Sequence, residues 1–152
     1  MTMQDSPSAL SADQRRSLQC LAETMIPASE EYGVPGAGDD VIFADILRSF
    51  GRDAEHVAAV LRLLDDLSRA VFADLNPLQR DAVASQLREA GGQSLMYLSQ
   101  IILQCYYRDD RVMRSLDMEL RPPFPKGFEV DQGDWSLLDP VRARPKLYRE
   151  VP

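Results

Sequence analysis

The last 32 residues of the chain, 121–152, follow no packing period, and this constrains the fold more than any other feature. Six of the ten prolines lie in this segment, together with the only tryptophan, Trp135. Proline removes a backbone hydrogen-bond donor and biases the preceding residue towards extended conformations. We therefore expect residues 121–152 to form an extended, proline- and aromatic-rich C-terminal arm that lies on its own helical body or on a partner protein.

Residues 1–120 predict the rest of an all-α fold, an irregular bundle of five or six helices in which residues 1–10 are mobile. Apolar residues recur at helical spacing between start and stop signals, and no segment alternates with the period of a β-strand. Ser11 with Gln14 fits a capping box, and Asn76-Pro77 fits a helix start. The expected helices span residues 11–27, 39–51, 53–75, 76–92, 93–107 and 109–116.

The fifth expected helix, residues 93–107, is apolar around most of its circumference. A helix of this kind is buried on several sides. It is either the central helix of the bundle, or a central helix that also gives one flank to an interface.

The longest loop of the body, residues 28–39, reads ASEEYGVPGAGD and contains three glycines. Loops of this length often carry function. A phosphate-binding glycine loop would follow a strand and precede a lysine-threonine pair, and neither is present in the sequence. We therefore expect no nucleotide site in this loop.

The chain is acidic, with a formal net charge of −7 at pH 7. Residues 121–152 hold six basic and five acidic residues, so residues 1–120 carry −8. This balance argues against nonspecific nucleic-acid binding, which needs a basic footprint, and it favours a basic partner surface.

Arg15-Arg16 invites comparison with a twin-arginine export signal. The residues that follow, SLQCLAETMIP, include Glu23 and reach a proline, so no long apolar region follows the arginines. No apolar run approaches the ~20 residues that a membrane helix needs. We therefore expect both arginines on the polar face of the first helix, and a cytoplasmic protein without a twin-arginine or secretory signal.

Residue types that carry chemistry are few. The single histidine, His56, is expected at the solvated surface, and a nucleophilic device would need it to meet a serine or cysteine through the fold. Cys20 and Cys105 are expected as buried thiols, and their spacing gives no reason for a disulfide. Asp65-Asp66 and Asp109-Asp110 are expected as helix caps and a solvated face. We predict no catalytic residue, no cofactor-binding residue and no metal ligand in this chain.

Two stretches together resemble a known family. The first is LAETMIPASEEYGVPGAGDDVIFADIL, Leu21–Leu47, in which a helix ends at a Thr-Met-Ile-Pro step before a Pro-Gly-Ala loop. The second is YYRDDRVMRSLDMELRPPFPKGFEVDQGDWSLLDPVRARPKLYR, Tyr106–Arg149. The pairing is similar to the gluconate 2-dehydrogenase subunit 3 family, small helical subunits that accompany FAD-dependent oxidoreductases of the glucose-methanol-choline (GMC) type.

This resemblance implies that the chain is a non-catalytic subunit. In such systems the large subunit binds FAD and holds the catalytic histidine, while the small subunit supports its folding, stability or export. Many members begin with a twin-arginine signal, and this chain departs from them there. The expected role is therefore to stabilise or help fold a flavoprotein that oxidises sugars or alcohols.

The arm offers aromatic anchors for such a partner, because interface hot spots favour tryptophan, tyrosine and arginine. We expect the arm and its root to bind the flavoprotein, with packing of the arm on its own bundle as the alternative. The expected contact residues are Tyr106, Tyr107, Pro122, Pro123, Phe124, Pro125, Phe128, Trp135 and Tyr148.

Two rival hypotheses belong to other classes. The first is a helical module that binds a small molecule or redox partner, with Met96, Cys105, Tyr106 and Tyr107 around a pocket. The second is an independent enzyme that uses His56 or the acidic pairs.

Overall fold

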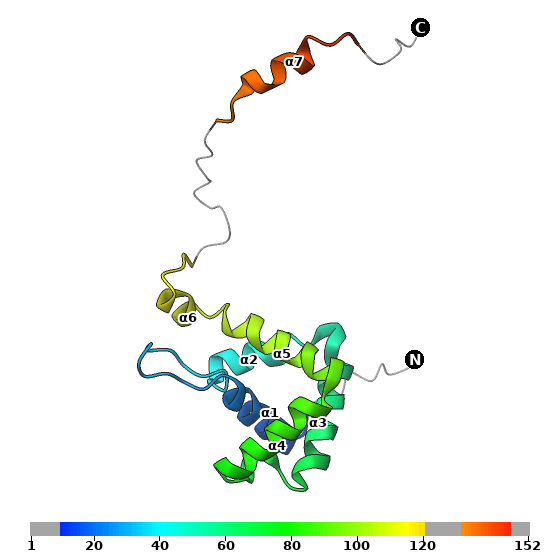
Figure 1. Cartoon of the computed structure of the whole chain (residues 1–152). Coiled ribbons are helices and arrows are strands. Elements are labelled where there is room, and N and C mark those ends of the chain that lie inside the picture. The colour runs from blue at the N-terminus through cyan, green and yellow to red at the C-terminus, as the bar shows by residue number, and fades with distance from the viewer. Residues whose placement is uncertain (1–9, 121–131, 147–152) are drawn as a thin grey trace, which may run out of the picture. The chain divides into compact units, whose positions relative to one another are not determined.

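The computed structural model describes residues 10–120 and 132–146, and it divides the chain into two units, Met1–Leu120 and Arg121–Pro152. Among the described residues the first unit holds six α-helices, so the predicted all-α fold class is confirmed (Figure 1). They are α1 (Ala12–Met25), α2 (Asp40–Arg48), α3 (Ala54–Ser68), α4 (Pro77–Ala90), α5 (Gly92–Tyr106) and α6 (Asp110–Ser115). Two short 3-10 turns, η1 (Gly51–Asp53) and η2 (Phe72–Asp74), lie before and after α3.

Side-chain caps set where the helices begin, as the sequence predicts. The Ser11 hydroxyl accepts a hydrogen bond from the backbone N–H of Gln14, and the Gln14 side chain accepts one from the Ser11 N–H. Asn76 and Gln79 form the same reciprocal pair at α4, which starts at Pro77. These pairs satisfy N–H groups that have no partner within the first helical turn.

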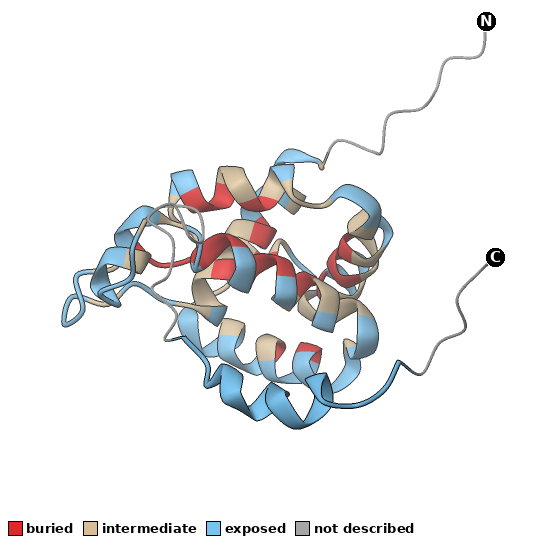
Figure 2. Cartoon of the chain, turned by 90° about the horizontal axis from the view of Figure 1, so that it is seen from above, coloured by how far each residue is buried: buried red, intermediate tan, exposed pale blue. Residues whose placement is uncertain are grey.

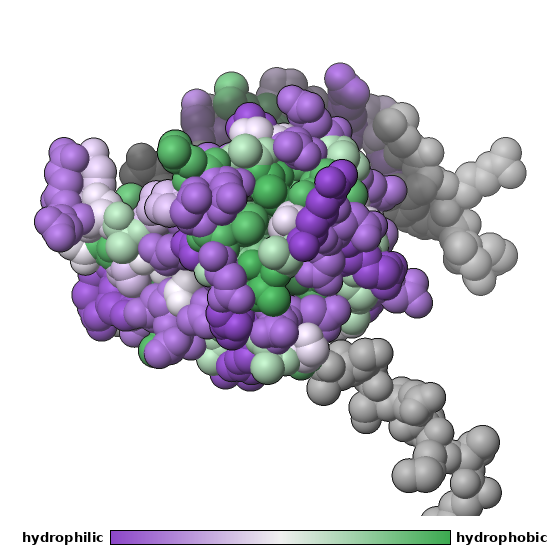
Figure 3. Space-filling view, turned by 90° about the horizontal axis from the view of Figure 1, so that it is seen from below, coloured by the Kyte–Doolittle hydropathy of each residue, from purple (hydrophilic) through white to green (hydrophobic). Residues whose placement is uncertain are grey.

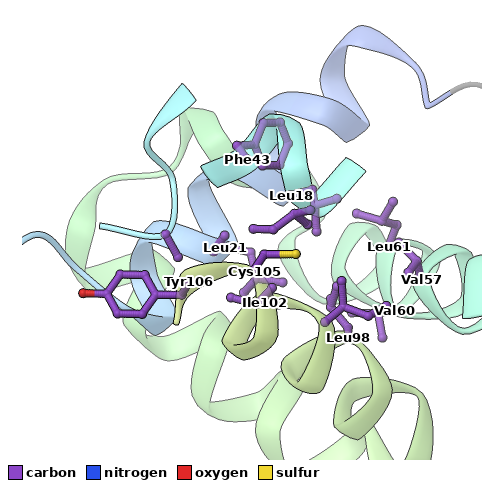
Figure 4. Packing of buried hydrophobic residues seen from close by; sticks show 14 of the residues in the cluster. Leu18, Leu21, Phe43, Val57, Val60, Leu61, Leu98, Ile102, Cys105 and Tyr106 are labelled. Atoms are coloured by element: carbon purple, nitrogen blue, oxygen red, sulfur yellow. The ribbon is translucent and has the colours of Figure 1, made fainter. Parts of the chain in front are cut away.

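The core lies between α1, α2, α3 and α5, whose buried residues face inward in Figure 2. Leu18, Phe43, Leu61 and Ile102 contribute one large side chain from each of these helices, and Figure 4 shows them converging. Phe72 of η2 is also fully buried. Burial of each such side chain contributes about 1.5–3 kcal/mol to the free energy of unfolding.

The third helix is shorter than its apolar pattern predicts. The sequence continues the helical spacing through Val71 and Leu75, but α3 ends at Ser68. Arg69 then takes a left-handed backbone conformation, with φ of 54°, and the Ser68 hydroxyl donates to the Ala70 carbonyl. The chain reverses there so that Phe72 enters the core beside α1, and this tertiary contact overrides the local pattern.

The fifth helix is central and also has an open flank. It packs against α2, α3 and α4, and its buried side carries Leu98 and Ile102. Met96 and Leu103, on the opposite side, are exposed. Figure 3 shows that apolar side chains also gather on one face of the molecule among hydrophilic ones. No helix within residues 10–120 and 132–146 is both long enough and apolar enough to cross a bilayer.

The described part of the second unit includes a helical segment, which corrects the expectation of an extended arm over these residues. Residues 135–142 form a 3-10 turn, η3 (Trp135–Leu138), that continues into α7 (Asp139–Arg142). Asp134 caps this segment by accepting from the N–H of Ser136. Pro140 lies in the first turn of α7, where its missing N–H leaves no hydrogen bond unmade.

Arg111 joins the starts of two helices. Its guanidinium donates to both carboxylate oxygens of Asp39, with N–O distances of 2.7 and 3.1 Å, and to Asp109 at 2.9 and 3.0 Å. Asp39 is the N-cap of α2 and Asp109 is the N-cap of α6. The hydrogen bonds from Arg111 hold the pKa of each carboxyl below its ordinary value. We call this arrangement the cap clamp.

A second arginine, close to Arg111 in the sequence, also binds α2. Arg108, just after α5, donates to the Asp45 carboxylate of α2 through Nε at 3.0 Å and Nη2 at 2.6 Å. Its Nη2 also reaches the Ser49 hydroxyl at 3.2 Å. The segment Arg108–Arg111 therefore attaches the end of α5 and the start of α6 to α2.

We predict that Arg111→Gln lowers the free energy of unfolding at pH 7 by about 1–2 kcal/mol, since it removes charge-assisted bonds at a partly exposed site. The folded-state pKa values of Asp39 and Asp109 are depressed, so their contribution is present above the unfolded pKa of ~4 and is lost as the pH falls through the folded values. The difference between wild type and variant should therefore shrink in acid. Urea unfolding at several pH values measures it.

Arg114→Gln is the matched control for this substitution. Arg114 meets Asp110 at 3.6 Å, and both side chains are well exposed, so its loss should cost little. An equal cost for the two variants would contradict a special role for the cap clamp.

Candidate functional site

The loop of residues 28–39, between α1 and α2, projects from the bundle in Figures 1 and 2. The carboxylate of Glu23 holds its base from the side of α1. It accepts hydrogen bonds from the backbone N–H of Ala28 at 3.2 Å and of Gly38 at 3.0 Å. The N–H of Ala37 donates to the Ile26 carbonyl at 2.8 Å, and Ala37 itself is fully buried. Both ends of the loop are thereby fixed to the last turn of α1.

Close packing against Glu23 explains two of the three glycines in this loop. A Cβ atom at Gly36 would overlap the Glu23 carboxylate, and one at Gly38 would lie 2.8 Å from the Glu23 Cβ. Any larger side chain at Gly36 would drive the carboxylate away from its two N–H partners. Gly36 and Gly38 are therefore a structural requirement of this anchor.

The outer part of the loop, residues 29–34, forms a small hairpin that we call the finger. Ser29 and Val34 exchange two backbone hydrogen bonds, each 3.0 Å long. The turn between them closes with the Gly33 N–H donating to the Glu30 carbonyl at 3.2 Å. Gly33 has φ of 62°, a left-handed value that favours glycine. The finger is therefore a defined turn and not an irregular loop.

A cleft of about 630 Å³ lies beside the base of this loop. Its wall includes Cys20 of α1 and Arg80 of α4. Arg80 donates to the Ala73 carbonyl at 2.5 Å, while its buried Nε has no hydrogen-bond partner among the described residues. Cys20 is only half-buried, although we expected full burial, and the desolvation that it does experience raises the pKa of its thiol. Cys105 is buried as predicted, and both cysteines are free thiols.

The twin arginines lie within α1, as predicted. Arg15 places its guanidinium 5.5 Å from the ring centre of Phe43. Arg16 pairs with Asp74 of η2 and with Asp13. Both residues thus have roles in the packing of the first helix.

His56 is not the solvated surface residue that the sequence suggests. Its ring stacks on Tyr97 with a centroid distance of 4.4 Å, and Nδ1 lies 3.1 Å from the Ser94 hydroxyl. The fold therefore does bring a serine to the histidine. Neither residue lines the 630 Å³ cleft, and among the described residues no carboxylate bonds to the imidazole. The pair joins α3 to α5.

The acidic pairs follow their expected structural roles. Asp109 caps α6, and Asp65 and Asp66 lie on the exposed side of α3. Partial burial is the main cause that raises the pKa of Asp65, and repulsion from Asp66 raises it further. Within residues 10–120 and 132–146, no three histidine, cysteine or acidic residues gather as metal ligands would.

Tyr106, one of the predicted partner contacts, is a core residue and not a surface residue. Its side chain is 6% exposed and belongs to the core, where burial raises the pKa of its hydroxyl. It lies at the edge of the cluster in Figure 4. Tyr107, one residue further along the helix, is 54% exposed and packs edge-on against the Tyr106 ring. Only Tyr107 of this pair is available to a partner.

Trp135, another predicted partner contact, is 60% exposed. Leu137, Leu138 and Val141 of the same helical segment are exposed with it. Residues 132–146 thus carry four apolar side chains that this segment does not bury itself. The remaining predicted contacts lie outside the described residues: Pro122, Pro123, Phe124, Pro125, Phe128 and Tyr148.

The predicted small-molecule pocket does not assemble as expected. Met96 and Tyr107 are exposed, while Tyr106 is buried. A second cleft, of about 340 Å³, lies beside Asp45 and Arg108, and Cys105 is part of its wall. Met96, Tyr106 and Tyr107 line neither this cleft nor the one of 630 Å³. The sequence did not identify Glu23 as a site residue. The one sequence signal for its role is the presence of Gly36 and Gly38 in the loop that follows α1.

Comparisons of the chain with protein-family models, curated proteins and solved structures found no match. The resemblance to the gluconate 2-dehydrogenase subunit 3 family therefore depends on the two quoted stretches alone.

We predict that Glu23→Ala loosens the loop of residues 28–39 and lowers the free energy of unfolding by about 1–2 kcal/mol, because two backbone N–H groups, of which that of Gly38 is partly buried, lose a charged acceptor. Hydrogen exchange should accelerate at the amides of Ala28 and Gly38. Glu31→Ala, at an exposed position of the same loop, is the control and should leave exchange at these amides unchanged. Equal protection in wild type and Glu23→Ala would refute the anchor.

Proposed function

We propose that this chain is a non-catalytic small subunit of a heteromeric FAD-dependent, GMC-type dehydrogenase or oxidase that acts on sugars or alcohols. FAD and the catalytic groups belong to the large subunit, which this chain stabilises or helps to fold. The primary support is the family resemblance of Leu21–Leu47 and Tyr106–Arg149.

The two resembling stretches are joined in the structure. The cap clamp links Asp39 of the first stretch to Arg111 of the second, 72 positions apart. Arg108 and Asp45 form a second link between them. The first stretch is thus bonded to the start of the second, which supports treating the two stretches as a single pattern.

The observation that carries the proposal is the apolar surface of residues 132–146. Trp135, Leu138 and Val141 are spaced three apart along a helical segment and are all exposed. Helical segments with an apolar face commonly bind in a groove of another protein. Tryptophan is also among the residues most enriched at interface hot spots. This segment therefore suits binding to a large subunit.

A second candidate is a small-molecule-binding module that needs no flavoprotein. The 630 Å³ cleft favours it, because its volume falls in the range of small-ligand sites. A ligand-induced rise in melting temperature of the isolated chain, abolished by Arg80→Ala, would favour this candidate.

The first test is co-purification of the tagged chain with the GMC-type flavoprotein encoded nearest to it. A co-eluting complex with flavin absorbance near 450 nm supports the proposal. A colourless chain that elutes alone, with a flavoprotein that is soluble and active without it, would contradict the proposal.

We predict that truncation after Leu120 abolishes this co-elution and leaves the melting temperature of the bundle nearly unchanged. Among the described residues, every member of the buried cluster lies between Leu18 and Val112, so the truncation removes none of them. Trp135→Ala with Leu138→Ala in the full chain should weaken the complex in the same way. Val41→Ala, an exposed apolar position on α2, is the control. Unfolding of the truncated chain would show instead that the arm supports its own bundle.

A further inference from the structure

The finger, residues 29–34, is a stiff projection whose shape does not depend on its tip. Its two sides are joined by the isolated Ser29–Val34 bridge, and the Tyr32 N–H donates to the Ser29 hydroxyl at 3.4 Å. Its base is fixed by Glu23 and by the buried Ala37. A loop held in this way loses little conformational entropy when it binds.

The side chains at the tip contribute little to the fold. Tyr32 is 68% exposed, and its hydroxyl makes no hydrogen bond to the described residues. Glu30 and Glu31 are exposed on either side of the turn, and neither pairs with a cation there. The Tyr32 ring is therefore held out on a fixed turn and is accessible to another molecule.

We propose that the finger is a protein-docking element, in which Tyr32 enters an apolar slot of the flavoprotein large subunit. The proposal rests on the function proposed above and names a contact for it. The slot must be concave because the finger is convex, and its rim must be basic because Glu30 and Glu31 flank the ring. Tyrosine suits such an anchor, since it buries a large area with few rotatable bonds.

The basic rim has a kinetic consequence. Complementary charges at the edge of an interface mainly raise the association rate, and salt screens them. The apolar slot instead governs dissociation, because Tyr32 must leave it before the complex separates. The two parts of the finger can therefore be measured apart.

The test uses the full chain and the intact flavoprotein, with binding kinetics measured by surface plasmon resonance at two salt concentrations. Tyr32→Ala should weaken binding about 30-fold or more, mostly through faster dissociation. Glu30→Gln with Glu31→Gln should slow association and reduce its salt dependence. Glu23→Ala leaves the tip intact and should weaken binding several-fold, because an unanchored finger must be ordered on binding.

Leu78→Ala is the matched control. The Leu78 side chain on α4 is 82% exposed, more than that of Tyr32, and lies outside the finger. This variant should bind as wild type does, and all variants should keep the wild-type melting temperature except Glu23→Ala. Wild-type affinity for Tyr32→Ala would overturn the finger proposal while the complex itself stands. Failure of the wild-type chain to bind the flavoprotein would overturn the proposed function, and the docking proposal with it. An equal loss for Leu78→Ala would also overturn the docking proposal.

Discussion

The cap clamp is the interaction on which the arrangement of this bundle depends. Arg111 meets two carboxylates that are themselves helix caps, so each carboxylate satisfies backbone donors and a guanidinium together. Without the cation, two negative charges would lie close together at the starts of α2 and α6. Asp39 is also the last residue of the loop of residues 28–39, so the clamp adds a second attachment at the end of the loop where Glu23 already binds Gly38.

Local signals were sufficient for most of the fold, because caps and apolar spacing act within a few residues. Ser11 and Asn76 started helices where their patterns predicted, and the all-α class followed. The same local reasoning failed at Arg69, because the left-handed turn there is stabilised by burial of Phe72 against another helix. Arg111 could not be paired from the sequence, since its partner Asp39 lies 72 positions away among many other acidic residues.

The Tyr106-Tyr107 pair shows why site residues were harder to predict than helices. Neighbouring helical residues point about 100° apart, so two identical side chains in succession usually have different environments. Tyr106 faces the core and Tyr107 faces solvent. His56 shows the opposite error. Its acidic neighbours in the sequence suggested exposure to solvent, but the packing of α3 on α5 brings it against Ser94 and Tyr97. Composition and spacing describe a helix, whereas the choice of its buried side depends on its neighbours.

On the proposals above, the chain holds its partner through two elements of different character. The finger belongs to the first unit, is rigid and carries acidic residues, whereas residues 132–146 belong to the second unit and present Trp135 with Arg142 and Arg144. When one element binds, the other meets the partner at a raised effective concentration, so neither needs high affinity alone. A chain with weak separate contacts can then form a stable complex, and binding through one element alone remains reversible. Such a division suits a subunit whose contribution is to hold another protein in shape.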